Sequence, residues 1–396
     1  MKGITILGAT GSIGSNTLSV LAEHLDKYQI VALTANSNVS QMLSHCLKFH
    51  PQYAAMQDES AAEQLRTQLK VIDPSITVLS GSEGLQRVAT LPEVDTVMAA
   101  IVGAAGLLPT LAAVRHQKRV LLANKETLVM AGHLFMSEIQ KHQSYLLPVD
   151  SEHNAIFQCL PTGYIPGQRY TQLESIYLTA SGGPFRNFSS DQLSSVTPAQ
   201  ACAHPTWSMG PKISVDSATM MNKGFEVIEA RWLFALEPHE INVLLHPQSI
   251  VHSFVAFKDG AFLAQLGDPD MRIPIAYALS WPDRLPVTTQ RLSMSGLRQL
   301  DFEPLSCDRF PCLKLAYQAM ERGGTSPAVL NAANEVAVNA FLNGKIRFSD
   351  IHAIVEGVLS RVTSQQALSL SDILAEDEKA RQEAGEFMMQ HCKITA

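Results

Sequence analysis

The stretch GITILGATGSIG, residues 3–14, decides the fold of the N-terminal part of this chain. An apolar run ends at Gly8, and Gly11 and Gly14 follow before a helical pattern that extends over about residues 13–25. Glycines at a strand-to-helix turn let backbone N–H groups approach a pyrophosphate, which then lies at the helix N-terminus. The spacing therefore predicts a dinucleotide site, and the alternative is a tight turn that binds no ligand.

Short apolar runs alternate with helical patterns through the first part of the chain. Further candidate strands lie at 28–36, 96–102, 118–125 and 144–150. Strands that alternate with helices are typical of a doubly wound parallel sheet, and nearly continuous apolar runs are typical of strands covered on both faces. We therefore expect an α/β fold with a Rossmann-type nucleotide-binding domain over residues 1–150.

The pattern changes after residue 150. Two apolar stretches, 175–183 and 250–267, predict strands of a mixed or antiparallel sheet, and Asp259-Gly260 predicts a hairpin in the second stretch. Prolines then punctuate a sparsely periodic segment, and only helical periodicity follows it. We expect an α+β domain, a linker and a C-terminal α-helical bundle, at residues 151–281, 282–311 and 312–396.

Composition limits the class of protein. The net charge of −7 and the pI near 6.0 argue against a nucleic-acid partner, which usually requires a basic face. No apolar run reaches the length of about 18 residues that a membrane span needs, so we expect no membrane partner. The six cysteines form no CxxC pair and the N-terminus resembles no secretory signal, which together favour the cytoplasm.

The end of the second strand bears on the choice of nucleotide. NAD sites usually place an Asp or Glu there to bind the ribose hydroxyls, whereas this chain has Asn36, Ser37 and Asn38. The absence of a carboxylate at this place favours NADP over NAD, although no Arg or Lys stands there either.

Two acids follow another apolar run, in LLPVDSEHNAIFQ, residues 146–158. On an extended segment Asp150 and Glu152 would point to the same side, and His153 would point away from both. Paired carboxylates of this kind suit Mg²⁺ or Mn²⁺. The alternative is a solvated loop that carries two ordinary acids.

A third ligand must come from elsewhere in the chain. In VDSATMMNKGFEVIEARW, residues 215–232, either Asp216 or Ser217 is expected to cap a helix. The body of that helix carries Asn222, Lys223 and Glu226 on one face. These side chains suit an anion next to a metal, and they equally suit a surface Lys–Glu pair.

Three further places could contact a ligand. Ser181 precedes two glycines in TASGGPF, where backbone N–H groups could meet a phosphate, unless this is a plain turn. His204 and Trp207 lie in a Pro/Gly-bounded loop, residues 200–212, which is either a packed anchor or a lid that closes over a ligand. Lys125 follows an apolar strand, where open α/β sheets bind ligands.

These motifs together resemble the 1-deoxy-D-xylulose-5-phosphate reductoisomerase family over essentially the whole chain. They are GATGSIG, LANKE, PVDSEHNAIFQ, TASGGPF, HPTWSMGPKISVDSATMMNKGFEVIEA and HPQSIVHS. The resemblance implies an NADPH-dependent oxidoreductase that uses Mg²⁺ or Mn²⁺, isomerises 1-deoxy-D-xylulose 5-phosphate and reduces it to 2-C-methyl-D-erythritol 4-phosphate. It also implies a homodimer formed through the α+β domain, which would be the catalytic domain. The alternative is another NADP-dependent dehydrogenase of a small phosphorylated carbonyl compound.

The resemblance also implies roles for residues at matching positions. The metal would be held by Asp150, Glu152 and Glu226, with Lys125, Glu152 and His204 as catalytic residues. The substrate would contact Lys125, Ser151, Glu152, Ser181, His204, Trp207, Ser217, Asn222 and Lys223. NADPH would contact Thr10, Gly11, Ser12, Ile13, Asn36, Ser37, Asn38, Asn124, Glu126 and Gly210. Many members carry a basic residue near position 37, and some carry one at position 211, where this chain has Ser37 and Pro211.

Overall fold

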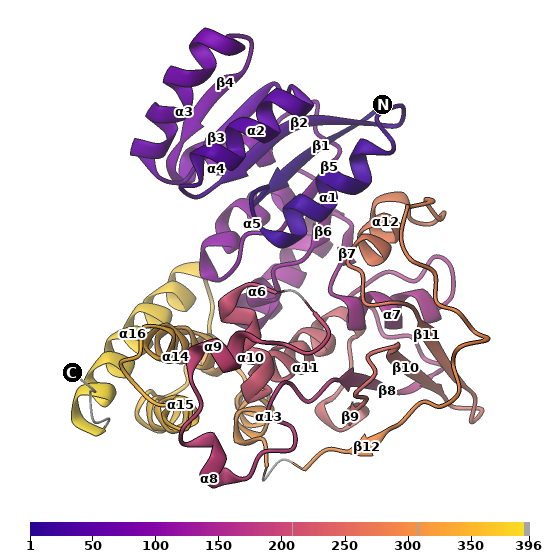
Figure 1. The fold of residues 1–396 in the computed structure, drawn as a ribbon, viewed down its shortest axis with the longest axis vertical. Helices are drawn as coiled ribbons and strands as arrows, with labels where there is room; N and C mark the ends of the chain where they lie inside the picture. The colour runs from indigo at the N-terminus through magenta and orange to yellow at the C-terminus, as the bar shows by residue number, and fades with distance from the viewer. Residues whose placement is uncertain (208, 307–308, 392–396) are drawn as a thin grey trace.

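The computed structural model describes residues 1–207, 209–306 and 309–391. Ser208 of the expected lid, two linker residues and the last five residues of the expected C-terminal bundle lie outside these ranges. The chain folds into a parallel sheet with its helices, a smaller sheet and a C-terminal group of helices (Figure 1). Within the described ranges no helix is both long enough and apolar enough to cross a membrane.

The N-terminal sheet has seven strands, and all of its pairs are parallel. The strand order is β4-β3-β2-β1-β5-β6-β7. Residues of the central strands are almost entirely buried, as expected for strands with helices on both faces. The expected doubly wound sheet is therefore confirmed. Its strands are β1 (Lys2–Leu7), β2 (Tyr28–Ala35), β3 (Tyr53–Met56), β4 (Thr77–Ser80), β5 (Thr96–Ala99), β6 (Arg119–Leu122) and β7 (Leu146–Pro148).

The winding direction of this sheet reverses at β1, because β2 lies on one side of it and β5 on the other. Right-handed crossovers place the first three helices on one face and the next three on the opposite face. Ligands of open α/β sheets bind at such a switch point, outside the C-terminal ends of the strands. The helices are α1 (Ser12–Ala22), α2 (Val39–Phe49), α3 (Glu59–Ile72), α4 (Gly81–Ala89), α5 (Leu107–Arg115) and α6 (Lys125–His142), with a short 3-10 turn η1 (Ala104–Gly106).

The second sheet is mixed, in the order β11-β10-β8-β9-β12. Strands β8 and β9 are parallel and the other pairs are antiparallel. Gly260, with φ of +88°, forms the expected hairpin between β10 and β11. The expected linker is not wholly irregular, because β12 within it pairs with β9. The strands are β8 (Leu173–Ala180), β9 (Ile241–Leu245), β10 (Val251–Phe257), β11 (Phe262–Leu266) and β12 (Glu303–Pro304).

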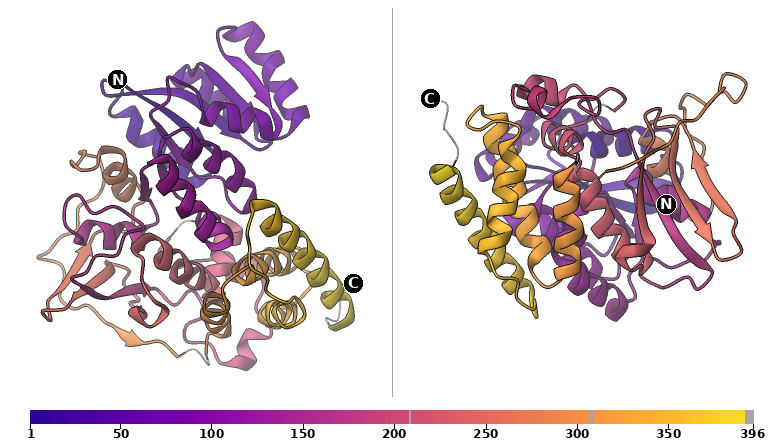
Figure 2. Two further views of the ribbon diagram at one scale, coloured as in Figure 1. Left: turned by 180° about the vertical axis from the view of Figure 1, so that it is seen from behind. Right: turned by 90° about the horizontal axis from the view of Figure 1, so that it is seen from below.

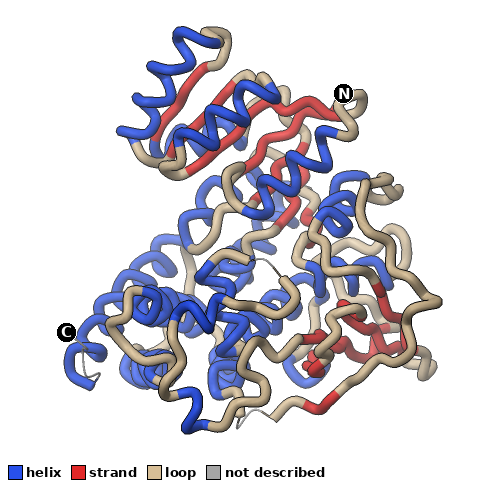
Figure 3. Tube along the Cα trace, in the orientation of Figure 1, coloured by secondary structure: helices blue, strands red, loops and turns tan. Residues whose placement is uncertain are grey.

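Helices pack between the two sheets, and a further group of helices forms the C-terminal part of the chain. Helix α11 packs between α6 and α13, and α14 contacts α6, α10, α15 and α16. Figures 2 and 3 show the C-terminal helices gathered on one side, away from the second sheet. The helices are α7 (Ser151–Cys159), α8 (Ser190–Leu193), α9 (Pro198–Cys202), α10 (Pro211–Thr219), α11 (Met221–Phe234), η2 (Pro238–Glu240), α12 (Arg272–Ser280), α13 (Pro311–Arg322), α14 (Ser326–Leu342), α15 (Asp350–Arg361) and α16 (Leu370–His391).

Candidate active site

The turn after β1 is tightly packed around its glycines. A Cβ on Gly14 would lie 2.2 Å from the carbonyl oxygen of Gly8, and a Cβ on Gly8 would lie 2.6 Å from that of Ala100. Helix α1 begins directly after Gly11, and no side chain caps it. Its first N–H groups therefore face the switch point without a side-chain acceptor, which suits a phosphate.

The other residues predicted to bind a nucleotide lie around this turn. Asn36 and Ser37 follow β2, and Asn38 caps α2 by accepting a hydrogen bond from the Gln41 N–H at 3.2 Å. Asn124 is buried, caps α6 through the Thr127 N–H at 2.9 Å, and donates to the Gly103 carbonyl at 3.0 Å. The Asn124 side chain thus fixes the loop after β5 against the start of α6.

The acids of the 146–158 stretch do not lie on an extended segment, so that prediction is wrong. Helix α7 begins at Ser151, with Asp150 at its N-cap position and Glu152 in its first turn. Acidic residues at a helix N-terminus are favoured by the helix dipole, which explains why the helix starts there. The carboxylates nevertheless converge: oxygens of Asp150, Glu152 and Glu226 lie within 4.8 Å of one another.

Lys125 and Asp150 meet because β6 and β7 are neighbours in the parallel sheet. Each residue begins the segment that follows its strand, and the Lys125 Nζ lies 2.6 Å from Asp150 Oδ2. The same ammonium lies 2.9 Å from Asn222 Oδ1 and 3.4 Å from Glu226 Oε1. Burial opposes ionisation of Asp150, but Lys125, His153 and Lys223 together outweigh it and hold the Asp150 pKa well below its usual range.

Helix α11 brings the third carboxylate and a second lysine. Lys223 lies 2.8 Å from Glu152 Oε1 and also pairs with Glu226, while Asn222 donates to Glu226 at 2.6 Å. Lys223 and Glu226 are buried, so the alternative of a surface Lys–Glu pair is wrong. Burial, reinforced by Glu152, raises the pKa of Glu226 to about 7 despite the two lysines.

The start of α11 also differs from the sequence-based expectation. Met220, with φ of +63°, separates α10 from α11. Asp216 and Ser217 therefore lie inside α10 and cap neither helix. This break turns the chain so that Ser217 and Asn222 line the same cavity.

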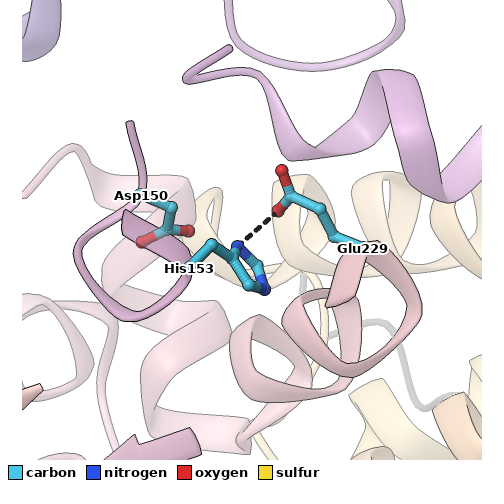
Figure 4. Close-up of side chains that lie close together, drawn as sticks. All are labelled: Asp150, His153 and Glu229. Carbon is cyan, nitrogen blue, oxygen red and sulfur yellow. Dashed lines mark ion pairs between the residues drawn. The ribbon is translucent and has the colours of Figure 1, made fainter. Parts of the chain in front are cut away.

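A ring nitrogen of His153 lies within 4.8 Å of an Asp150 oxygen, so the prediction that His153 points away is wrong for Asp150. His153 is buried, with Nδ1 3.2 Å from Glu229 Oε2 (Figure 4). Its Nε2 lies 2.9 Å from the Glu226 carbonyl oxygen. Ligand atoms of Asp150, His153 and Glu229 lie within 4.8 Å of one another. Burial lowers the pKa of His153, but the Glu229 carboxylate overrides this and raises it to about 9. His153 thus holds the backbone of α11 next to the carboxylate cluster.

The turn after β8 places Ser181 opposite the expected lid. Ser181 Oγ lies 3.0 Å from His204 Nε2. Because His204 Nδ1 accepts the Trp207 N–H at 2.9 Å, the proton of the neutral ring is on Nε2, which donates to Ser181. A Cβ on Gly183 would lie 2.9 Å from the Ser217 carbonyl oxygen, so this glycine allows the turn to pack against α10.

One cavity brings most of the predicted residues together. Its lining includes both nucleotide-turn residues and carboxylate-cluster residues, namely Ser12, Ile13, Lys125, Asp150, Ser151, Glu152, Ser181, His204, Trp207, Gly210, Ser217, Asn222, Lys223 and Glu226. The remaining predicted nucleotide contacts do not line it: Thr10, Gly11, Asn36, Ser37, Asn38, Asn124 and Glu126.

The cavity also has lining residues that the sequence did not indicate individually. Ile213, Met220 and Met271 supply apolar surface, and Ser249 and His252 supply polar groups. The ring of His252 lies 6.1 Å from that of Trp207. Ser249 and His252 belong to the motif HPQSIVHS, and this motif was the only sequence feature that could have indicated them. The spacing of its residues does not assign a role to either side chain.

The structure and sequence match one family of known proteins. The family model of 1-deoxy-D-xylulose 5-phosphate reductoisomerase matches residues 4–132 of the sequence. Two family models of C-terminal domains of this enzyme match residues 146–234 and 266–383. The protein of that name from Stutzerimonas stutzeri (strain A1501) is 56% identical over 388 residues, 98% of each chain.

Solved structures agree along the whole length. The reductoisomerase from Zymomonas mobilis, solved in complex with NADPH, is 46% identical, with a TM-score of 0.90 over 98% of each chain. Another reductoisomerase, solved with NADPH, fosmidomycin and magnesium, is 44% identical, with a TM-score of 0.94 over 99% of this chain and 100% of its own. The chain belongs to the 1-deoxy-D-xylulose 5-phosphate reductoisomerase family.

Proposed function

We propose that this protein converts 1-deoxy-D-xylulose 5-phosphate to 2-C-methyl-D-erythritol 4-phosphate, using NADPH and a divalent cation. The observation that carries the proposal is the carboxylate cluster, Asp150, Glu152 and Glu226, which shares one cavity with the start of α1. A metal site and a dinucleotide turn in one cavity suit a reaction that needs both a Lewis acid and a hydride donor. Family membership and the NADPH and magnesium bound by related structures support the same assignment.

The donor set fits a hard divalent cation. Its oxygens come from carboxylates alone, and Mg²⁺ and Mn²⁺ prefer such ligands. Two lysine ammonium groups neutralise part of the cluster charge through their contacts with Asp150, Glu152 and Glu226. We propose Mg²⁺ or Mn²⁺ at this place, one ion for each chain. When bound, it supplies a Lewis acid that polarises a carbonyl group.

The turn after β1 fits a dinucleotide. Gly14 allows α1 to lie against the turn, and the uncapped start of α1 offers Ser12 and Ile13 N–H groups to a pyrophosphate. NADPH supplies the hydride when it is bound, and the predicted contacts at residues 10–13, 36–38, 124, 126 and 210 are its proposed site. The polar residues after β2 leave room for a 2′-phosphate without a repelling carboxylate.

The remaining side chains of the cavity suit an anionic sugar phosphate. We propose that Ser181, Ser217, Asn222 and Lys223 hold the phosphate, because they combine hydroxyl, amide and ammonium donors in one cavity. A cation bound to Asp150, Glu152 and Glu226 would compete with Lys125 and Lys223 for these carboxylates. Both ammonium groups then become available to the anionic substrate.

Three side chains are proposed to act on the reacting end. Lys125 lies at the carboxylate cluster and can stabilise negative charge that develops on a substrate oxygen. Glu152 accepts a hydrogen bond from the Ser151 hydroxyl at 2.5 Å. We propose that Glu152 transfers a proton during the reaction and that Ser151 contacts the substrate. His204 donates from Nε2, and Trp207 on the same loop closes the cavity against water.

We further propose that the chain forms a homodimer. Its proposed domains are the nucleotide-binding domain at residues 1–150, the catalytic domain at 151–281, the linker at 282–311 and the C-terminal helical bundle at 312–396. Phe262 and Leu263 on β11 are 59% and 49% exposed, which leaves apolar surface on the second sheet for a second copy. Cys46, Cys159, Cys202 and Cys312 are free thiols, which supports a cytoplasmic location.

The experiment that tests the proposed function follows NADPH absorbance in the presence of 1-deoxy-D-xylulose 5-phosphate. NADPH should be oxidised with Mg²⁺ or Mn²⁺ and not after EDTA treatment, and added metal should restore the rate. Oxidation that is insensitive to EDTA would favour a metal-independent NADP-dependent dehydrogenase instead.

A further inference from the structure

A largely buried polar network joins the lid end of the cavity to two other parts of the molecule. Lys212 on α10 lies 2.8 Å from Glu126 Oε1 on α6 and 2.9 Å from Asp216 Oδ2 on its own helix. Asn334 on α14 donates to the other oxygen of Asp216 at 2.7 Å. We call these four residues the α10 network, and they connect α6, α10 and α14.

Lys212 lies directly after the loop that carries Trp207, so the network can hold one end of that loop in place. Lys212 is the second residue of α10, and Gly210, at the end of the loop that carries Trp207, precedes the helix. Asp216 and Asn334 are at most 1% exposed, so their side chains have little freedom to move. The ammonium of Lys212 therefore fixes the C-terminal end of the lid loop to α6.

The two carboxylate oxygens of Glu126 have different partners. Oε1 accepts from Lys212 at 2.8 Å, whereas Asn124 Nδ2 donates to Oε2 over a longer distance, 3.3 Å. Burial alone would raise the pKa of Glu126, but the charge and hydrogen bond of Lys212, with a backbone hydrogen bond and the Lys125 charge, keep the pKa below its usual value. The side chain is thus an ionised acceptor whose Oε2 is held by a longer hydrogen bond than Oε1.

We propose that Lys212 is a positioning residue for the nicotinamide cofactor. It orients the Glu126 carboxylate so that Oε2 can accept from ribose hydroxyl groups, and it ties the end of the lid loop to the same carboxylate. An ionised carboxylate oxygen can accept hydrogen bonds from ribose hydroxyl groups. The inference rests on the proposed function, because it requires NADPH to reach Glu126.

The variants Lys212→Met, Glu126→Gln and their combination separate this role from a structural one. NADPH binding is measured by fluorescence titration without substrate, and the melting temperature is recorded for each variant. Lys212→Met should weaken NADPH binding roughly tenfold, in the range of typical coupling between sites. In the Glu126→Gln background the same change should have less than about a twofold effect, because the partner is already neutral.

Two comparisons and one replacement variant complete the test. Lys212→Arg should restore binding to within about threefold of wild type, because the charge is kept. Lys141→Met, which removes a surface pair with Glu138 on α6, is the matched control and should bind NADPH normally. Lys212→Gln replaces Lys212→Met if the latter does not fold.

Two outcomes would overturn the inference in different ways. If Glu126→Gln alone leaves NADPH binding unchanged, the proposed ribose contact is wrong and Lys212 has nothing to position. If Glu126→Gln weakens binding while Lys212→Met does not, or if the two effects add, the cofactor contact stands and the positioning role of Lys212 is wrong.

Discussion

Glu226 is the residue whose protonation most directly controls the proposed metal site. It is fully buried and lies between two other carboxylates and two lysines. Burial and Glu152 raise its pKa to about 7, whereas the lysines lower it. A cation that binds here must therefore displace a proton whenever the pH lies below this value.

The first prediction concerns the pH dependence of metal affinity. Below pH 7 Glu226 is mostly protonated, so Mg²⁺ affinity should fall about tenfold for each pH unit, since one proton is released on binding. Above pH 7 the affinity should level off. Calorimetric Mg²⁺ titrations on either side of this pH measure the slope.

The matched variant is Glu226→Gln, which removes the titrating group and keeps the shape of the side chain. Its weaker Mg²⁺ affinity should not change with pH in the same range. A wild-type affinity that is equally independent of pH would contradict the role assigned to Glu226.

At the scale of elements, the site depends on the residues that come directly after each parallel strand. The ends of β6 and β7 place Lys125 and Asp150 side by side, and the turn after β1 places α1 at the switch point. The turn is held by close backbone contacts at Gly14, where a Cβ would lie 2.2 Å from the Gly8 carbonyl oxygen and 2.6 Å from Ala9 Cα. Backbone atoms cannot yield as a flexible side chain would.

The second prediction is that Gly14→Ala lowers stability and weakens NADPH binding together. Overpacking of this kind costs about 1–3 kcal/mol, and the start of α1 must shift away from the turn. Thermal unfolding and NADPH titration measure the two effects.

Gly385→Ala is the matched control for this substitution. A Cβ on Gly385, inside α16, meets nothing within 4 Å. This variant should be stabilised by up to about 1 kcal/mol, because alanine favours the helix over glycine. A Gly14→Ala protein as stable as wild type would contradict the packing described for the turn.

At the scale of the whole molecule, the second sheet presents apolar surface that the chain itself leaves exposed. Phe262 and Leu263 lie on the edge strand β11, and the Phe262 ring packs 5.7 Å from that of Tyr177 on β8. An edge strand with exposed apolar residues is a favourable surface for association.

The third prediction is that Phe262→Asp converts the proposed dimer to monomers. A charge in the centre of an apolar interface would have to be buried without a partner. Sedimentation velocity measures the oligomeric state. Leu25→Asp, at a residue 52% exposed in the N-terminal part, is the control and should leave the dimer intact. An intact dimer in the Phe262→Asp variant would place the interface elsewhere.

The parts of the fold that were predictable from sequence depend on local signals. The glycine turn, the alternating strands of the first sheet and the hairpin at Gly260 each follow from residues within a few positions of one another. The helix that starts at Ser151 had a local signal too, since Asp150 is a good N-cap residue, but the apolar run before it favoured an extended conformation.

The site itself could be predicted only in part, because its contacts are long-range. The pairing of Lys223 with Glu152 joins residues 71 positions apart, and that of Lys125 with Glu226 joins residues 101 apart. Neither spacing nor periodicity reports such contacts, and only the resemblance to a family connected these motifs. The left-handed turn at Met220 also lacks a sequence signal, because methionine rarely adopts it.

A titration with Mn²⁺ followed by electron paramagnetic resonance tests directly whether the carboxylate cluster binds the metal. We expect one tightly bound ion for each wild-type chain, and affinity at least about tenfold weaker in Asp150→Asn, because a ligand charge is lost. Asp283→Asn, a change outside the cavity, should bind as wild type does. Equal Mn²⁺ affinity in Asp150→Asn and wild type would show that the carboxylate cluster is not the metal site.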